Sequence, residues 1–187
     1  EITKFPMYKR AQLGIGYLAQ EPSVFRTLSV EENILAPMQM TGQFSKKEQK
    51  ERTDALLEEF RLTHIRKSEG RMLSGGERRR TEIARALATD PHFILLDEPF
   101  AGVDPIAVED IQILVAKLKK RNIGVLITDH NANETLSITD YVYIQFEGKT
   151  FTSGTSEDVA KNDGVKERYF GRHYEYKRKI FSSEELS

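Results

Sequence analysis

Residues 90–99 read DPHFILLDEP, an apolar run that ends in two adjacent carboxylates. The run Phe93–Leu96 is apolar throughout, which is typical of a parallel strand covered on both faces. Ligands in parallel α/β sheets bind beyond the carboxyl ends of strands, so we expect a ligand site at Asp97 and Glu98. Asp97 is suited to hold Mg²⁺, directly or through water. Glu98 is suited to orient an attacking water or to accept its proton.

The alternative for this pair is two exposed carboxylates at a strand end. Pro99 and the following segment 101–104, which reads AGVD, argue against that alternative.

Helices and short apolar runs alternate around this stretch. A helix is expected over about 75–89, and Asp104-Pro105 is an N-cap followed by proline at the first helical position, opening a helix to about Lys120. Apolar runs at 125–128 and 141–146 predict further strands, with a helix over about 131–138 between them. Strand, helix and strand in sequence imply a parallel sheet with right-handed crossovers. The first strand-like stretch is 15–18.

Residues 21–72 are expected to form a helical insertion. Ser29 and Glu32 make a capping-box pattern that opens a helix to about Met40, where Gly42 follows. A second helix begins at the similar pattern 45–48, and its apolar residues recur at helical spacing: Ala55, Leu56, Leu57 and Phe60. The predicted organisation is a sheet remnant over 1–20, a helical subdomain over 21–72, a core half over 73–171 and a mobile tail over 172–187.

A second motif lies at 73–77, which reads LSGGE and is followed by three arginines. Ser74 occupies an N-cap position, and Gly75 and Gly76 remove side chains from the first turn. Backbone N–H groups and the positive end of the helix dipole are then open to an anion. An ordinary capping box between Ser74 and Glu77 is the alternative interpretation.

Two further polar residues follow strands of the same predicted sheet. His130 comes after the strand 125–128, so we expect it beside the acidic pair, in contact with a γ-phosphate. Gln20 follows the strand 15–18; a glutamine in a loop usually has no special role, and this one gains weight only from the other motifs.

In this order the motifs resemble those of ABC-type ATPases, over about residues 12–171. The resemblance implies an α/β fold: an incomplete P-loop NTPase (RecA-like) parallel sheet with an inserted helical subdomain. It implies ATP and Mg²⁺ as cofactors. Gln20 matches the Q-loop, with a catalytic and a metal-binding role, and 93–98 matches Walker B with Glu98 as the catalytic glutamate. The remaining matches are the signature motif with Ser74, Gly75, Gly76 and Glu77, the D-loop ending at Asp104, and the switch histidine His130.

Several segments look more specifically like the lipopolysaccharide-export members of that family: 20–26, 73–80, 93–105 and 124–131. This resemblance implies a cytoplasmic homodimer, peripheral on the inner membrane and bound to transmembrane transporter subunits. Phe25 and Arg26 would then lie in the groove that receives the coupling helices of those subunits. The alternative is that Phe25 is simply part of the core.

One part of the family pattern is absent from the sequence. The P-loop, G-x-x-x-x-G-K-[ST], cradles phosphates with its backbone N–H groups and its lysine. The candidate Gly148-Lys149-Thr150 has Tyr143 where the first glycine is required, and we interpret it as a turn between strands. The aromatic residue that stacks on adenine would likewise precede Glu1. We therefore expect truncation, weak nucleotide binding and negligible hydrolysis by this chain alone, with an unfilled strand position in the sheet.

Composition excludes several other classes of function. The 28 Lys+Arg residues against 29 Asp+Glu give a net charge of −1, with no basic footprint for nucleic acid. Zero cysteines exclude a disulfide scaffold. No apolar run approaches the roughly 20 residues that span a bilayer, and no export signal is visible, so direct membrane insertion is not expected.

Two alternatives to a transport ATPase remain. The first is a non-catalytic half-site or interaction module that lends its signature motif to a partner. The second is a soluble ABC ATPase of DNA repair or chromosome structure, which the absence of sustained heptads disfavours.

Overall fold

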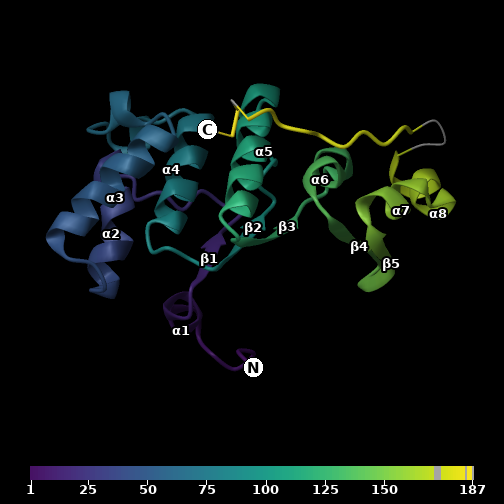
Figure 1. Ribbon diagram of the computed structural model, residues 1–187, viewed down its shortest axis with the longest axis horizontal. Coiled ribbons are helices and arrows are strands. Elements are labelled where there is room, and N and C mark those ends of the chain that lie inside the picture. The colour runs from purple at the N-terminus through teal and green to yellow at the C-terminus, as the bar shows by residue number, and fades with distance from the viewer. Residues whose placement is uncertain (171–173, 184, 187) are drawn as a thin grey trace.

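The computed structural model describes residues 1–170, 174–183, 185 and 186. Its centre is a three-stranded parallel sheet in the order β1 (Ile15–Leu18), β2 (Phe93–Asp97) and β3 (Gly124–Thr128). Helix α4 (Gly75–Leu87) packs on β1 and α5 (Pro105–Lys120) packs on β3, as Figure 1 shows. The predicted α/β class with a parallel sheet is thereby confirmed.

The sheet is buried on one face only. In β2, Ile94 and Leu96 are almost fully buried, whereas Phe93 is 39% exposed. Tyr17 of β1 and Leu126 of β3 are exposed as well. The expectation that 93–96 is covered on both faces was therefore wrong for the described residues. The physical reason is that α4 and α5 lie against the same face.

Two consecutive helices that contact each other form the predicted helical segment. Helix α2 (Val30–Thr41) is capped reciprocally by Ser29 and Glu32, and Gly42 ends it with a left-handed φ of 64°. Helix α3 (Lys46–Glu59) begins with the capping box of Ser45 and Glu48. Both helix starts are where the sequence predicts them. Of the residues at helical spacing, Leu56, Leu57 and Phe60 are buried and Ala55 is exposed.

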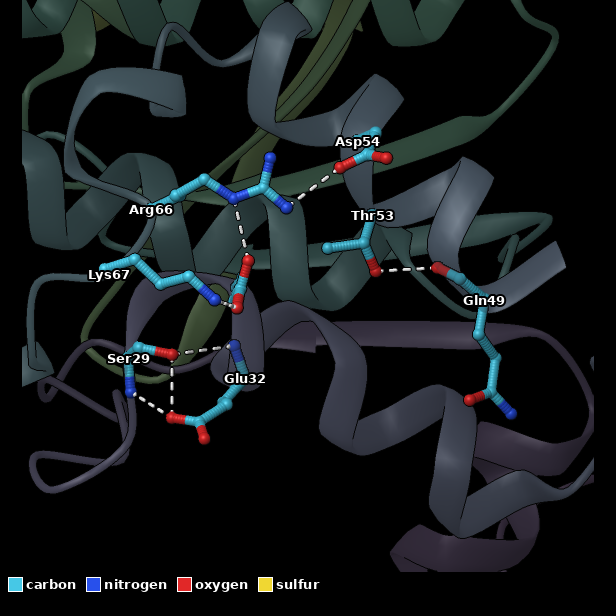
Figure 2. Close-up of polar contacts among 8 residues, drawn as sticks. Ser29, Glu32, Gln49, Thr53, Asp54, Arg66 and Lys67 are labelled. Atoms are coloured by element: carbon cyan, nitrogen blue, oxygen red, sulfur yellow. Dashed lines mark hydrogen bonds and ion pairs between the residues drawn. The ribbon is translucent and has the colours of Figure 1, made fainter. Parts of the chain in front are cut away.

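Short 3₁₀ turns, η1 (Thr63–Ile65) and η2 (Gly70–Met72), lead from α3 to α4. Arg66, which lies between η1 and η2, links helices α2 and α3. Its Nε lies 2.7 Å from Oε2 of Glu31 on α2, and its Nη2 lies 3.0 Å from Oδ1 of Asp54 on α3. Lys67 donates to the other oxygen of Glu31. Figure 2 shows the Arg66 guanidinium between Asp54 and the capped start of α2.

This cluster gives the stability a defined pH dependence. Hydrogen bonds from Lys67 and Arg66 hold the pKa of Glu31 below its ordinary value of 4.5. Because this pKa is lower in the folded state than in the unfolded chain, ionised Glu31 stabilises the fold above pH 4.5. That stabilisation is lost as the pH falls through the pKa of Glu31 in the folded protein. We expect Glu31→Gln to lower the free energy of unfolding by about 1 kcal/mol at pH 7.

Below pH 4.5 that difference should shrink progressively. Urea denaturation of the wild type and the variant at pH 7 and at more acidic pH values measures it. Glu58→Gln, at an exposed position of α3, is the control and should show no such trend. An equal difference at all pH values would contradict the assignment to Glu31.

The region after β3 departs from the predicted alternation. Helix α6 (Ala132–Ile138) is present, but β4 (Tyr141–Phe146) pairs antiparallel with β5 (Lys149–Thr155) in a separate sheet. The expectation that 141–146 continues the parallel sheet was wrong, because the tight turn after it sends the chain back along β4. The turn itself is made by Glu147 and Gly148, whose φ angles are 48° and 72°. The predicted turn between strands is therefore present at Gly148, whereas Lys149 and Thr150 already belong to β5.

The remaining helices are short and lie before β1 and after β5. Helices α7 (Ser156–Lys161) and α8 (Asp163–Val165) and a π turn over 166–170 pack near the hairpin, around Leu136, Ile144, Val159 and Val165. Helix α1 (Met7–Gln12), which buries no residue, was not predicted. None of the described helices is long and apolar enough to span a bilayer.

Part of the tail contacts the body of the protein. The backbone N–H of Lys179 donates to Ser137 O at 3.0 Å, and its Nζ donates to Gln112 Oε1 at 2.5 Å. Of the predicted mobile segment 172–187, residues 172, 173, 184 and 187 lie outside the described residues. The mobility of the tail and the domain boundaries at 20, 72 and 171 stay predictions.

Candidate functional site

Asp97 is held at the carboxyl end of the sheet by one hydroxyl from each neighbouring strand. Thr128 Oγ1 donates to Asp97 Oδ1 at 2.5 Å, and Tyr17 Oη donates to Asp97 Oδ2 at 3.2 Å. Burial and the Asp97 carboxylate raise the pKa of Tyr17 above its ordinary value of 10.0, so its hydroxyl remains a donor at neutral pH. The Asp97 carboxylate, on the central strand, is therefore held by side chains from both neighbouring strands.

Glu98 brings together three of the residues that the sequence predicted. Its Oε2 accepts a hydrogen bond from Gln20 Nε2 at 2.9 Å and lies 3.3 Å from His130 Nδ1. The backbone at Glu98 has a φ of 41°, an unusual conformation for a residue with a side chain. Such outliers cluster at functional sites, where the surrounding structure holds them in place. The His130 side chain is 73% exposed, so this cluster faces solvent.

A buried carboxylate supports the two loops that carry Glu98 and His130. The side chain of Asp129 is fully buried. It accepts the backbone N–H of Phe100 at 3.1 Å and that of Asn131 at 2.7 Å. Asp129 therefore joins the loop after β2 to the loop after β3. This role was not predicted from the sequence, and neither were those of Tyr17 and Thr128. The only available signal was that these residues lie at or beside strand ends.

The signature segment, 73–77, belongs to a second group of predicted site residues, separate from the group around Glu98. Ser74 and Glu77 form the capping box at the start of α4, with Ser74 N donating to Glu77 Oε2 at 2.8 Å. The hydrogen bond from the Ser74 hydroxyl is the main cause that holds the pKa of Glu77 below its ordinary value of 4.5. The capping-box alternative is thus realised, but a Cβ on Gly75 would meet nothing within 4 Å, so the first turn remains open.

This open turn faces a cleft of about 280 Å³ that it shares with the D-loop. The cleft is lined by Ser74, Gly75, Gly76, Glu77, Arg80, Gly102, Val103, Asp104, Ile106 and Asp110. Asp104 Oδ1 also accepts the backbone N–H of Ile106 at 3.1 Å. The predicted site residues therefore fall into two groups: Gln20, Glu98 and His130 beside Asp97, and the signature with the D-loop.

Phe25 lies on a loop whose backbone is tightly fixed. Asn33, fully buried in α2, accepts the backbone N–H of Phe25 at 2.8 Å and donates to its carbonyl at 3.1 Å. The Phe25 ring is 46% exposed, and the Arg85 guanidinium lies 5.0 Å from its centroid. Arg26, next in the chain, is exposed. Phe25 is therefore not a fully buried core residue, and its contact with a partner stays a prediction.

Comparison with known proteins agrees with this architecture. The family model described as "ABC transporter" matches residues 1–101. The chain therefore belongs to the ABC transporter family. Its sheet matches solved ATP-binding cassettes, including that of MJ1267, at 30% identity and a TM-score of 0.76 over 91% of this chain and 74% of that one.

More particular similarities lie among curated sequences. A probable ABC transporter ATP-binding protein of Azorhizobium caulinodans is 56% identical over 93% of this chain. The lipopolysaccharide export system ATP-binding protein LptB of Haemophilus influenzae is 51% identical, and that of Escherichia coli K12 is 48% identical, each over 93% of this chain. The chain spans 62% of the length of the first relative and 72% of each LptB.

Proposed function

We propose that this chain is part of an ATP-hydrolysing subunit of an ABC transporter. The convergence of Gln20 and His130 on the Glu98 carboxylate carries the proposal. Glu98 accepts a proton from the attacking water, and Gln20 and His130 hold its carboxylate in place. His130, exposed beside it, contacts the γ-phosphate.

The residues present fit a magnesium ion that is held mainly by nucleotide phosphates. Among the described residues no group of three or more His, Cys, Asp or Glu could hold a metal by itself. Mg²⁺ is commonly bound by one or two carboxylates together with substrate phosphates. Asp97 would supply the carboxylate and Gln20 an amide oxygen. When bound, the ion neutralises charge that develops on the transferred phosphoryl group.

We further propose that the signature cleft serves a second copy of the chain. Its open first turn offers backbone N–H groups and a helix dipole to an anion. In a homodimer the cleft would contact the phosphates of a nucleotide held mainly by the other protomer, with Ser74, Gly75, Gly76, Glu77 and Asp104 contributing.

The relatives named LptB support lipopolysaccharide as the transported substrate and its export as the process that the transporter performs. In this proposal the protein is cytoplasmic and peripheral on the inner membrane, where transmembrane subunits hold it. The exposed ring of Phe25 and the neighbouring Arg26 would receive their coupling helices. Other relatives of similar identity carry no such designation, so the substrate rests on the LptB similarity.

The sequence of this chain contains no P-loop pattern, so we propose that it hydrolyses ATP negligibly by itself. The deciding experiment compares Mg²⁺-dependent phosphate release by the 187-residue chain and by a version extended upstream to include a P-loop. We expect activity at least about 100-fold higher in the extended version, because phosphate-binding groups contribute on this scale. Activity in the short chain would mean that other groups bind the phosphates.

A second candidate is the non-catalytic half-site that lends its signature motif to a partner. The intact signature cleft is compatible with it. Absence of hydrolysis in the extended version, with stimulation of a partner cassette, would favour this candidate.

A further inference from the structure

Helix α4 presents three charged side chains in succession to the loop 19–25. Arg79, Glu82 and Arg85 are spaced by three residues, which places them on one side of the helix. Arg79 and Glu82 are both buried, Glu82 being only 2% exposed. Charged residues are rarely buried without partners, so their contacts indicate what they do.

Glu82 is bonded to the middle of the loop. Its Oε1 accepts the backbone N–H of Ser23 at 2.5 Å and that of Val24 at 3.0 Å. Its other oxygen lies 3.5 Å from Arg79 Nη1. An apolar side chain of similar volume would avoid the cost of desolvating a carboxylate. What Glu82 adds is a specific attachment of the loop backbone to α4.

The two arginines extend this attachment in both directions. Arg79 donates to Ala19 O at 2.9 Å and to Asp97 O at 3.3 Å, at the end of the loop next to the acidic pair. Arg85 donates to Ser23 O at 2.6 Å and lies over the Phe25 ring, at the other end. Burial lowers the pKa of both guanidinium groups below its ordinary value.

The loop so attached begins and ends at proposed functional residues. Gln20, near one end, donates to Glu98, and Phe25, at the other, is the proposed partner contact. The helix to which the loop is attached begins with the signature segment. Helix α4 therefore carries the signature segment at its start and contacts both the backbone beside the acidic pair and the ring of Phe25.

We propose that Glu82 is a positioning residue that fixes the loop 19–25 to α4, so that Gln20 and Phe25 move together with the signature segment. This inference rests on the proposed function for its role in hydrolysis, but the attachment itself does not depend on it.

Amide hydrogen exchange of the 187-residue chain, followed by NMR, tests the attachment. Glu82→Met keeps the volume and removes the acceptor; we expect exchange at Ser23 and Val24 to become at least about 10-fold faster. The amide of Phe25, bound by Asn33, is the internal reference and should change less than about twofold. Glu82→Gln keeps an acceptor oxygen and should remain within about threefold of wild type at Ser23 and Val24.

Unchanged exchange in Glu82→Met, or equal acceleration at Phe25, would overturn the proposal. If Glu82→Met does not fold, the wild-type chain still decides: Ser23 and Val24 must exchange more slowly than the neighbouring Glu21. Equal rates at these three amides would overturn the proposal without any variant.

The role in hydrolysis is measured in the version extended to include a P-loop. We expect Glu82→Met to lower kcat about 10-fold with KM for ATP within about twofold, and Glu82→Gln to restore most of kcat. A purely structural role would lower the thermal midpoint and the active fraction, so kcat is calculated per nucleotide-binding-competent site and would then equal that of the wild type. If the extended wild type itself hydrolyses no ATP, the proposed function fails while the exchange result still decides the attachment.

Discussion

Glu98→Gln should lower Mg²⁺-dependent ATP hydrolysis at least about 100-fold in a version of the chain extended to include a P-loop, because general base catalysis typically contributes 10²–10⁴-fold. The amide has the same shape as the carboxylate and still accepts a hydrogen bond from Gln20, so the loop geometry should persist. ATP binding should therefore stay within about threefold of wild type. Phosphate release and equilibrium binding of a fluorescent nucleotide measure the two effects separately.

A matched control is Glu109→Gln, which makes the same chemical change at an exposed position of α5. Its hydrolysis rate should match that of the wild type. If turnover survives in Glu98→Gln, another group takes the proton from water, and the convergence of Gln20 and His130 on Glu98 has a different purpose.

Phe25→Ala should abolish most of the association with the transmembrane subunits. Aromatic residues at the centre of an interface often contribute 2 kcal/mol or more, which corresponds to about 30-fold or more in affinity. The ring is half-exposed and the backbone is held by Asn33, so folding should not depend on the side chain. Co-purification with the membrane subunits measures assembly, and thermal unfolding measures stability.

Tyr143→Ala is the control for this variant, since Tyr143 is an exposed aromatic residue on β4. It should leave assembly unchanged. A large drop in the thermal midpoint of Phe25→Ala, with assembly lost only in proportion, would instead support a core role for Phe25.

Local sequence patterns predicted most of the helices and strands. The capping boxes at Ser29, Ser45 and Ser74 placed three helix starts, because they depend on residues only three positions apart. The proline after Asp104 similarly placed the start of α5. These features are decided within one turn of chain, so tertiary contacts do not override them.

Features that depend on distant partners were predicted less well. The apolar run 93–96 indicates a buried strand, but whether helices cover one face or both is decided elsewhere in the chain. Strand β4 carries no local signal for its direction of pairing; the turn at Gly148 and the following β5 decide it. Helix α1 buries nothing, so it lacks the apolar periodicity by which helices are recognised.

The candidate site shows the same division. Glu98 and His130 could be placed together because strands in a parallel sheet end at a common edge. The contributions of Tyr17 and Thr128 to Asp97 could not, since one hydroxyl among many carries no distinguishing pattern. Glu82 was also missed, because a glutamate within a helix is ordinarily a solvated residue and only burial reveals its partners.

The two hydrogen bonds between Asn33 and the backbone of Phe25 have a consequence for the docking proposed at this surface. They fix both polar groups of one residue from a single buried side chain, so the loop is ordered during folding. Binding of the proposed coupling helix would therefore cost the loop little further conformational entropy. Encounter requires no rearrangement of the loop, and differences in affinity among partner variants should appear in the dissociation rate.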